Sequence, residues 1–249
     1  MTDHTVVSHA EWVTARKKLL EKEKEFSKLR DELTRLRQGL PWEKVEKEYT
    51  FDGPHGSVTL ADLFGDKSQL IVYHFMFDPE WTEGCKSCSF IADHYNPAIV
   101  HLEHRDVAMV TISRAPLEKL EAFKKRMGWN FKWVSSFGSD FNWDYHVSFT
   151  LEQIQKGEMY YNYHVGKFPG SEAPGVSVFY KSDSGELFHT YSSFARGLEN
   201  FLGTYTWLDI VPKGRDEAAL SYGMEWVKHH DRYQDASFGA LSGRDRKEA

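Results

Sequence analysis

The stretch QLIVYHFMFDPEWTEGCKSCS, residues 69–89, decides the fold of this chain. Its first part, residues 69–77, is a nearly continuous apolar run, which is typical of a central strand covered on both faces of a sheet. Cys85 and Cys88 follow at i, i+3 spacing, and residues 89–103 can form the next helix. The sequence therefore predicts a buried strand, a loop, and a helix that starts at the two cysteines.

Short strands and helices alternate on both sides of this stretch. We expect a hairpin of residues 49–51 and 57–59, a strand at 107–113, a helix at 117–127, a strand at 131–135, and a closing hairpin of 176–180 and 186–191. Such alternation around a buried sheet predicts an α/β layout. The aromatic-rich stretch at about 140–170 fits no repeated strand–helix unit, so we interpret it as an insertion packed against the domain.

Further helices are expected at both ends of the chain. Ser8 and Glu11 have capping-box spacing, and Gly39 with Pro41 supplies a stop signal, so residues 8–38 predict one long helix. Residues 215–233 predict a C-terminal helix, and residues 239–249 predict a polar, frayed tail. We therefore expect an N-terminal helical extension (1–47), a core domain (48–212) and a C-terminal helix and tail (213–249).

A narrow apolar stripe runs along the predicted N-terminal helix. Its members recur at heptad spacing: Trp12, Leu19, Phe26 and Leu33, with Leu29 and Leu36 three residues after the last two. Ala15 and Lys22 occupy the two equivalent positions nearer the N-terminus, where a coiled coil would place larger apolar residues. The stripe favours packing on the helix's own domain and also allows a homodimer through this helix.

Composition excludes several classes of protein. Apolar residues make up 41% of the 249 residues, which is enough for a sizeable core. The formal net charge is -6 with no long basic block, so we expect neither nucleic-acid nor membrane binding. Only two cysteines occur, residues 1–10 are polar, and no apolar run reaches the length of a membrane span. These features favour a cytoplasmic protein, where a cysteine pair is more often catalytic or metal-binding than structural.

The position of the cysteine pair predicts redox chemistry. A helix N-terminus offers free backbone N–H groups and partial positive charge, which stabilise a thiolate. Lys86 adds a positive charge beside Cys85. The i, i+3 spacing brings both sulfurs to one end of the first turn, so Cys85 can attack and Cys88 can resolve a mixed disulfide.

Two other interpretations of the pair remain open. A zinc site would need further ligands, for which His74, His94 or His146 are candidates. The pair could also be an inert remnant of a redox fold. His74 in the strand run favours a core histidine over a proton relay, and His229-His230-Asp231 favour a solvated or capping role over a metal cluster. We expect no metal and no cofactor.

Residues 71–89 resemble the strand–loop–helix entrance of thioredoxin-superfamily proteins, and the layout is similar to that of peroxiredoxins. Thr82-Glu83-Gly84-Cys85 matches the peroxiredoxin Thr-x-x-Cys signature, which implies that Cys85 is the attacking sulfur. Residues 107–136 and 174–191 resemble the strand–helix–strand and the final hairpin of those proteins. The whole sequence resembles a bacterial domain-of-unknown-function family (number 899) of thioredoxin-like dithiol–disulfide oxidoreductases. The resemblance implies a thioredoxin-like fold, a central mixed sheet flanked by helices.

Departures from the peroxiredoxin pattern concern the surroundings of Cys85. Asp78 replaces the signature proline, and the arginine that supports the peroxidatic thiolate has no counterpart before the hairpin strand, although Arg114 or Arg196 could substitute. Pro174 stands where thioredoxin folds carry a cis proline beside the substrate, with an ordinary trans proline as the alternative. Trp81 could shield the sulfur or form part of a docking surface.

These observations together predict a dithiol–disulfide oxidoreductase. Its catalytic residues would be Cys85 and Cys88, supported by Thr82, Trp81, Lys86 and Pro174. The expected substrates are thiols or disulfides, including disulfides in proteins. The alternatives are a peroxiredoxin-like thiol peroxidase and a non-catalytic, redox-sensitive binding protein.

Overall fold

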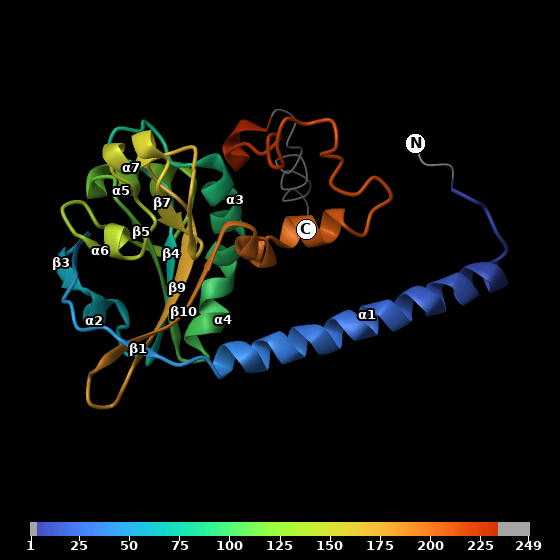
Figure 1. Ribbon diagram of the computed structural model, residues 1–249, viewed down its shortest axis with the longest axis horizontal. Coiled ribbons are helices and arrows are strands. Elements are labelled where there is room, and N and C mark those ends of the chain that lie inside the picture. The colour runs from blue at the N-terminus through green and yellow to red at the C-terminus, as the bar shows by residue number, and fades with distance from the viewer. Residues whose placement is uncertain (1–3, 234–249) are drawn as a thin grey trace, which may run out of the picture. The chain divides into compact units, whose positions relative to one another are not determined.

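A computed structural model describes residues 4–233 of the chain (Figure 1). The chain forms two compact units, Met1–Trp42 and Glu43–Ala249. This boundary lies earlier than the one expected after residue 47, because Glu43 and Lys44 pair with a strand of the second unit. In the described part of the chain, no helix has the length and apolar character needed to cross a membrane.

The first unit is dominated by one helix, α1 (His9–Gln38). Ser8 caps it, and both reciprocal hydrogen bonds of the capping box with Glu11 are present. The helix ends before Gly39, whose N–H bonds back to carbonyl oxygens of the last turn. The predicted helix at 8–38 and its capping box are therefore confirmed. No residue of α1 is buried.

The second unit is built around an eight-stranded mixed sheet. Its strands are β1 (Glu43–Lys44), β2 (Thr50–Gly53), β3 (Gly56–Thr59), β4 (Gln69–His74), β5 (Val107–Ser113), β6 (Lys132–Ser135), β9 (Gly175–Lys181) and β10 (Leu187–Phe194). They lie in the order β1-β10-β9-β4-β5-β6-β2-β3. Strand β4 is central, parallel to β5 and antiparallel to β9, so the apolar run that opened the sequence lies in the middle of the sheet.

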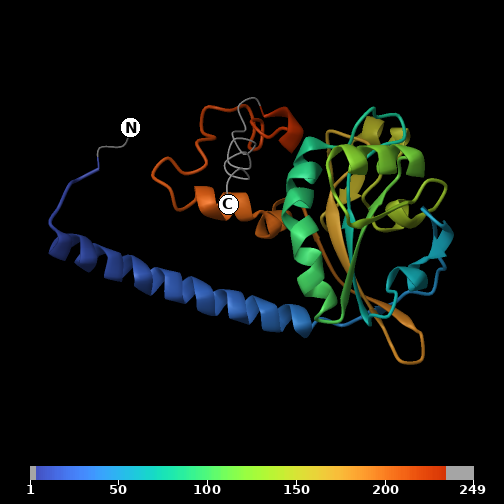
Figure 2. The same cartoon turned by 180° about the vertical axis from the view of Figure 1, so that it is seen from behind.

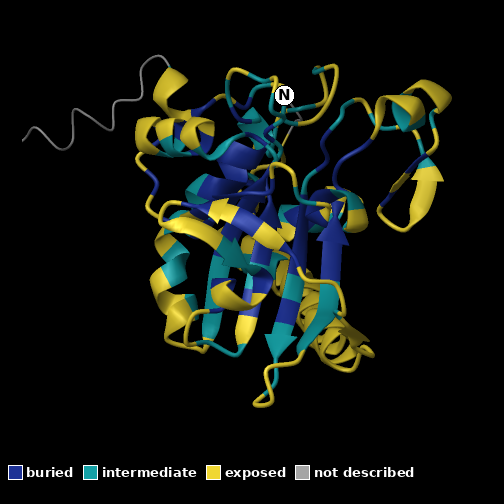
Figure 3. Cartoon of the chain, turned by 90° about the vertical axis from the view of Figure 1, so that its left-hand side faces the viewer, coloured by how far each residue is buried: buried dark blue, intermediate teal, exposed yellow. Residues whose placement is uncertain are grey.

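Helices cover both faces of this sheet, as Figures 1 and 2 show from opposite sides. They are α2 (Leu60–Leu63), α3 (Lys86–Tyr95), η1 (Asn96–Ala98), α4 (Ile99–Glu103), α5 (Leu117–Arg126), α6 (Phe141–Asp144), α7 (Leu151–Lys156), η2 (Ala195–Phe201) and α8 (Gly203–Leu208). Side chains of α3, α5, η2 and α8 share one core with Tyr73 and Phe75. Side chains of α2 and α6 form the other core with Leu70 and Val72, and the buried colour in Figure 3 follows these central strands.

The segment expected as an insertion forms a small subdomain of its own. It contains α7 and a separate two-stranded sheet of β7 (Met159–Tyr161) and β8 (His164–Gly166), whereas Phe141 of α6 belongs to the core of the main sheet. Its apolar side chains, with Phe149 and Met159 among them, pack against Phe194 at the end of β10. This subdomain therefore lies against the edge of the sheet where β10 ends.

The strand order identifies the fold. The series β10-β9-β4-β5-β6 has three parallel strands, β4, β5 and β6, and an antiparallel hairpin beside β4. A helix that begins with the cysteine pair follows the central strand. This arrangement is a thioredoxin-like fold with the layout of peroxiredoxins, so the predicted fold class is confirmed.

The predicted C-terminal helix at 215–233 is wrong. Within that segment the described helical residues are those of η3, a short 3-10 turn (His230–Arg232). Asp216 and Met224 adopt positive φ angles, which a right-handed helix does not allow. The Glu217 carboxylate accepts hydrogen bonds from the Met224 N–H and the Trp226 indole, so a side chain closes a loop here. The tail predicted at 239–249 lies outside the described residues.

Candidate functional site

Cys85 lies at the junction between the central strand and α3, where it is the N-cap residue. Its N–H donates to the Met76 carbonyl (3.1 Å), and its own carbonyl accepts from the Ser89 N–H (2.9 Å). Gly84 lets the loop approach the core closely, because a Cβ atom there would lie 2.7 Å from a ring carbon of Phe75. The loop is therefore hydrogen-bonded to the segment that follows β4 on one side and to α3 on the other.

The surroundings of Cys85 favour its thiolate. Its pKa is lowered from 9.0 to about 7, first by a hydrogen bond from the Cys88 thiol. Burial opposes this effect, while the backbone N–H groups of Cys88 and Ser87 and the charge of Lys86 add to it. The expected activation at a helix start is thus present, but the second cysteine contributes more than the helix or the lysine.

Cys88 is buried one turn further along α3, with 1% of its surface exposed. The Met76 N–H donates to its sulfur (3.4 Å). Burial raises its pKa well above 9, and the hydrogen bond and charge of Cys85 raise it further. The interaction between the two thiols therefore lowers the pKa of Cys85 and raises that of Cys88, so that of the two sulfurs Cys85 ionises first.

Tyr73 faces the buried sulfur from β4. It belongs to the same apolar core as Cys88, and burial followed by the charge of Cys88 raises the pKa of its hydroxyl. At ordinary hydrogen-bond geometry this hydroxyl has no partner within the described chain. The residues of the sequence motif did not indicate Tyr73, although the alternation of side chains along β4 places it on the face of the sheet that α3 covers.

The four residues predicted to support the cysteine pair differ in their contacts with it. The ammonium of Lys86 donates to the Glu225 carbonyl (2.8 Å) and still lowers the pKa of Cys85. Trp81 packs at the margin of the core that contains Cys88. Thr82 is exposed and makes no side-chain hydrogen bond with the rest of the described residues.

Pro174 precedes β9, and its carbonyl accepts the Tyr161 hydroxyl (2.7 Å). No cis peptide bond occurs among residues 4–233, so the trans alternative applies to Pro174. Neither candidate arginine is directed to the cysteines: Arg114 pairs with the buried Glu172 (2.8 Å), and Arg196 pairs with Glu199 (3.2 Å). The peroxiredoxin-type arginine therefore has no substitute at these two positions.

The last described segment, residues 222–233, borders the cysteine site, and we call it the C-terminal strap. Figures 1 and 2 both show its red end beside the start of α3. His229 is buried, and its Nε2 lies 2.9 Å from the Gly84 carbonyl, next to Cys85. The interpretation of His229 as a solvated or capping residue is therefore wrong.

Ion pairs hold the strap to the loop before Cys85. Glu83 bonds to Arg126 of α5 (2.8 Å) and to Arg232 of the strap (2.7 Å). Arg126 also pairs with Asp231 (2.8 Å). A surface pocket of about 810 Å³, lined by Glu83, Gly84 and Lys86 together with strap residues, lies alongside. No spacing in the sequence signalled these contacts, since the partners are far apart along the chain.

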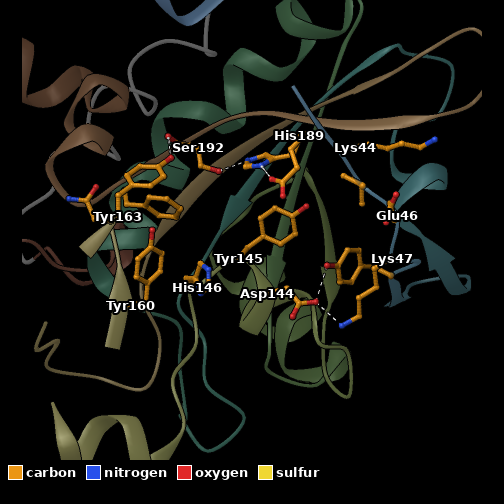
Figure 4. Close-up of a pocket in the computed structure, with 15 residues that line it drawn as sticks. Lys44, Glu46, Lys47, Asp144, Tyr145, His146, Tyr160, Tyr163, His189 and Ser192 are labelled. Atoms are coloured by element: carbon orange, nitrogen blue, oxygen red, sulfur yellow. Dashed lines mark hydrogen bonds and ion pairs between the residues drawn. The ribbon is translucent and has the colours of Figure 1, made fainter. Parts of the chain in front are cut away.

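His74 lies on the opposite face of the sheet from Cys88. Its ring stacks on Phe141, and its Nε2 lies 2.8 Å from the Ser177 hydroxyl. Ser177 bonds to Ser192, which bonds to His189 at a separate pocket of about 410 Å³ (Figure 4). Burial lowers the pKa of His74 to about 3, so the core interpretation holds and a relay to Cys85 is excluded by position.

The proposed zinc ligands do not converge. His94 bonds to the Phe90 carbonyl and to Thr204, and His146 packs against Tyr160. Among residues 4–233, no group of three or more His, Cys, Asp or Glu residues is arranged to hold a metal ion. The alternative that used these histidines with the cysteine pair is therefore not supported by their positions.

Comparisons with known proteins agree with this picture at the level of family. The model of a family described as "Bacterial protein of unknown function (DUF899)" matches residues 1–233. No curated protein matches the chain.

Solved structures show a more distant likeness. PrxQ from Xylella fastidiosa, a mutant form, is 12% identical with a TM-score of 0.40, covering 67% of this chain and 94% of its own. Peroxidoxin BcpB from Mycobacterium tuberculosis is 13% identical with a TM-score of 0.41, covering 66% and 95%. StoA from Bacillus subtilis is 13% identical with a TM-score of 0.37, covering 61% and 90%. At these scores the fold assignment rests on the strand order of this chain itself.

Proposed function

This chain belongs to the bacterial DUF899 family, and we propose that it catalyses thiol–disulfide exchange through Cys85 and Cys88. The observation that carries the proposal is the placement of the pair: Cys85 is the N-cap residue of α3, and Cys88 lies buried one turn further along that helix. In these positions the pKa of Cys85 is lowered and that of Cys88 is raised. One sulfur is thereby prepared to attack at neutral pH, and the other lies buried in the first turn of α3 and stays protonated until the second step. We place this activity in a reducing compartment such as the cytoplasm.

The first step is attack by the Cys85 thiolate on a substrate disulfide. A bond forms between Cys85 and one substrate sulfur, and the other substrate sulfur leaves as a thiolate that takes a proton from water. With a pKa of about 7, about half of Cys85 is ionised at neutral pH. The backbone N–H groups at the start of α3 hold that charge before the attack.

The second step is attack by Cys88 on Cys85, which releases the reduced substrate and leaves a disulfide in the protein. Cys88 must first lose its proton. Two of the three causes that raise its pKa come from Cys85, namely a hydrogen bond and a charge, and both disappear once Cys85 is part of a mixed disulfide. The Met76 N–H, which already donates to this sulfur, then stabilises the new thiolate, and the Tyr73 hydroxyl, which has no other partner in the described chain, is free to turn toward it. An external dithiol restores the reduced pair.

The test is disulfide reduction by the full chain with a dithiol reductant. Cys85→Ser should abolish turnover, and Cys88→Ser should accumulate a mixed disulfide at Cys85 that mass spectrometry detects. The matched control is Ser87→Ala, which changes a neighbouring hydroxyl and leaves both sulfurs in place. The proposal fails if either cysteine variant turns over a model disulfide as fast as the wild type.

A thiol peroxidase is the second candidate, favoured by the lowered pKa of Cys85 and the nearby Cys88 that could condense with a sulfenic acid. Against it, Arg114 and Arg196 are both paired elsewhere. Peroxide-dependent loss of thiols far faster than that of free cysteine would favour the peroxidase. A change of mass on oxidation without turnover of either substrate would favour a redox-sensitive binding protein.

A further inference from the structure

We propose that α1 binds the α1 of a second copy of this chain as a parallel, in-register, two-stranded coiled coil. The apolar stripe on α1 and the charges on both sides of that stripe carry the inference. It concerns the first unit alone and is independent of the cysteine chemistry.

The stripe is exposed along its whole length. It consists of residues Trp12, Leu19, Phe26, Leu29, Leu33 and Leu36, and the exposed fraction ranges from 41% at Leu33 to 65% at Phe26. Residues 12–36 span about 37 Å at the rise of an α-helix. An apolar stripe of this length on a helix with no buried residue needs a covering surface.

The charged residues on both sides of the stripe indicate which surface covers it. With Trp12, Leu19, Phe26 and Leu33 at heptad position a, the flanking g positions are Glu11, Lys18, Glu25 and Glu32, and the e positions are Arg16, Glu23, Arg30 and Arg37. In a parallel, in-register dimer each g residue faces the e residue five places later in the other helix. All four facing pairs then join opposite charges: Glu11 with Arg16, Lys18 with Glu23, Glu25 with Arg30, and Glu32 with Arg37.

The antiparallel arrangement over the same span does not have this property. There g faces g and e faces e. Glu11 would face Glu32, and Arg16 would face Arg37, so like charges would meet at both ends. The charges therefore specify parallel orientation and register as well as a second copy of this helix.

Two interruptions of the stripe fit the same arrangement. Ala15 is small, so it leaves no polar group in the seam. Lys22 pairs with Glu25 of its own helix (2.9 Å), which directs its ammonium to the flank while the aliphatic stem stays in the seam. A single lysine or asparagine within a seam lowers stability but fixes register.

The first test is the mass of the full chain by sedimentation equilibrium at tens of micromolar. We expect twice the 28.9 kDa of one chain. Leu19→Glu places two unpaired charges in the seam and should weaken the dimer about tenfold or more. Leu20→Glu is the matched control, because Leu20 is the next residue, lies outside the a and d positions, and is also exposed (39%). Circular dichroism verifies that each variant is folded.

The second test uses charge reversal to determine orientation. Glu25→Lys alone and Arg30→Glu alone each create like-charged facing pairs, so each homodimer should weaken. Mixing the two variants restores opposite charges in a parallel heterodimer and should restore the association. A monomeric wild type would overturn the proposal, as would equal effects of the two leucine variants. Failure of the mixture to associate better than either variant alone would refute the parallel register. Disulfide turnover reports on the other unit and separates these outcomes from the proposed function.

Discussion

Replacing Cys88 by alanine should raise the pKa of Cys85 and slow its alkylation at neutral pH. The Cys88 thiol is the largest cause of the lowered pKa of Cys85, and alanine removes this donor. Cys88→Ser is the matched variant, because a hydroxyl of similar size can still donate a hydrogen bond to the thiolate. The alanine variant should therefore shift the titration further than the serine variant.

The structure sets the size of this effect. The pKa of Cys85 is lowered from 9.0 to about 7, which corresponds to about 3 kcal/mol in favour of the thiolate. At pH 7 a thiol with a pKa of about 7 is about 50% ionised, and one with a pKa of about 9 is about 1% ionised. The alkylation rate at pH 7 can thus fall by up to about fiftyfold in the alanine variant. The remaining N–H donors and Lys86 make a smaller decrease the expected result.

The assay is the rate of iodoacetamide labelling of Cys85 between about pH 5 and pH 9, followed by mass spectrometry of the cysteine-containing peptide. Cys88 does not interfere, because it is buried and its pKa is raised. The reasoning is refuted if wild-type Cys85 titrates at or above about 8.5, the value of an unperturbed thiol. It is equally refuted if the alanine variant titrates at the wild-type pH.

Three further predictions follow from the surroundings of the site. Tyr73→Phe should leave the alkylation rate of Cys85 unchanged but slow the step in which Cys88 resolves the mixed disulfide. Quenched-flow mass spectrometry would then detect the mixed disulfide as an accumulated intermediate. Equal rates of resolution in the variant and the wild type would contradict a role for this hydroxyl. His229→Ala should lower the free energy of unfolding in urea by about 1–3 kcal/mol, because the Gly84 carbonyl loses its hydrogen-bond partner. The control His230→Ala changes a half-exposed side chain and should alter this free energy by less than about 1 kcal/mol. Equal losses in the two variants would contradict a stabilising role of the buried contact. Burial lowers the pKa of His74 to about 3, so this side chain stays neutral in the folded state, whereas in the unfolded state it takes up a proton below about pH 6.5. The free energy of unfolding should therefore fall by about 2 kcal/mol from this group between pH 7 and pH 5. His74→Asn should lose that part of the pH dependence.

The parts of the fold that could be predicted are those determined by neighbouring residues. The capping box of α1 joins Ser8 to Glu11, three residues apart, so its signal is local. The apolar run of β4 predicts a central strand because only a strand covered on both faces can bury every residue of such a run. The cysteine pair at the start of α3 could also be recognised, because its two members are only three residues apart.

The strap could not be predicted because its structure depends on contacts that are distant in sequence. Val227 is fully buried, yet it lies in the segment that was expected to form a C-terminal helix. His229 bonds to the Gly84 carbonyl across 145 positions. Nothing in His229-His230-Asp231 distinguishes the histidine that becomes buried from the one that stays half exposed. The heptad spacing of the apolar stripe on α1 was visible in the sequence, but the sequence did not show whether other residues cover that stripe.

The surroundings of the two cysteines favour one order of attack in the proposed exchange. Burial opposes ionisation of both sulfurs, so burial alone would leave two unreactive thiols. The two thiols shift each other's pKa in opposite directions, and the one whose pKa is lowered is at the helix start, where backbone N–H groups add to the stabilisation. The other thiol, deeper in the core, is then penalised by the charge it stabilises. When Cys85 forms a mixed disulfide, that charge is gone and the penalty on Cys88 decreases, so the first step itself prepares the second.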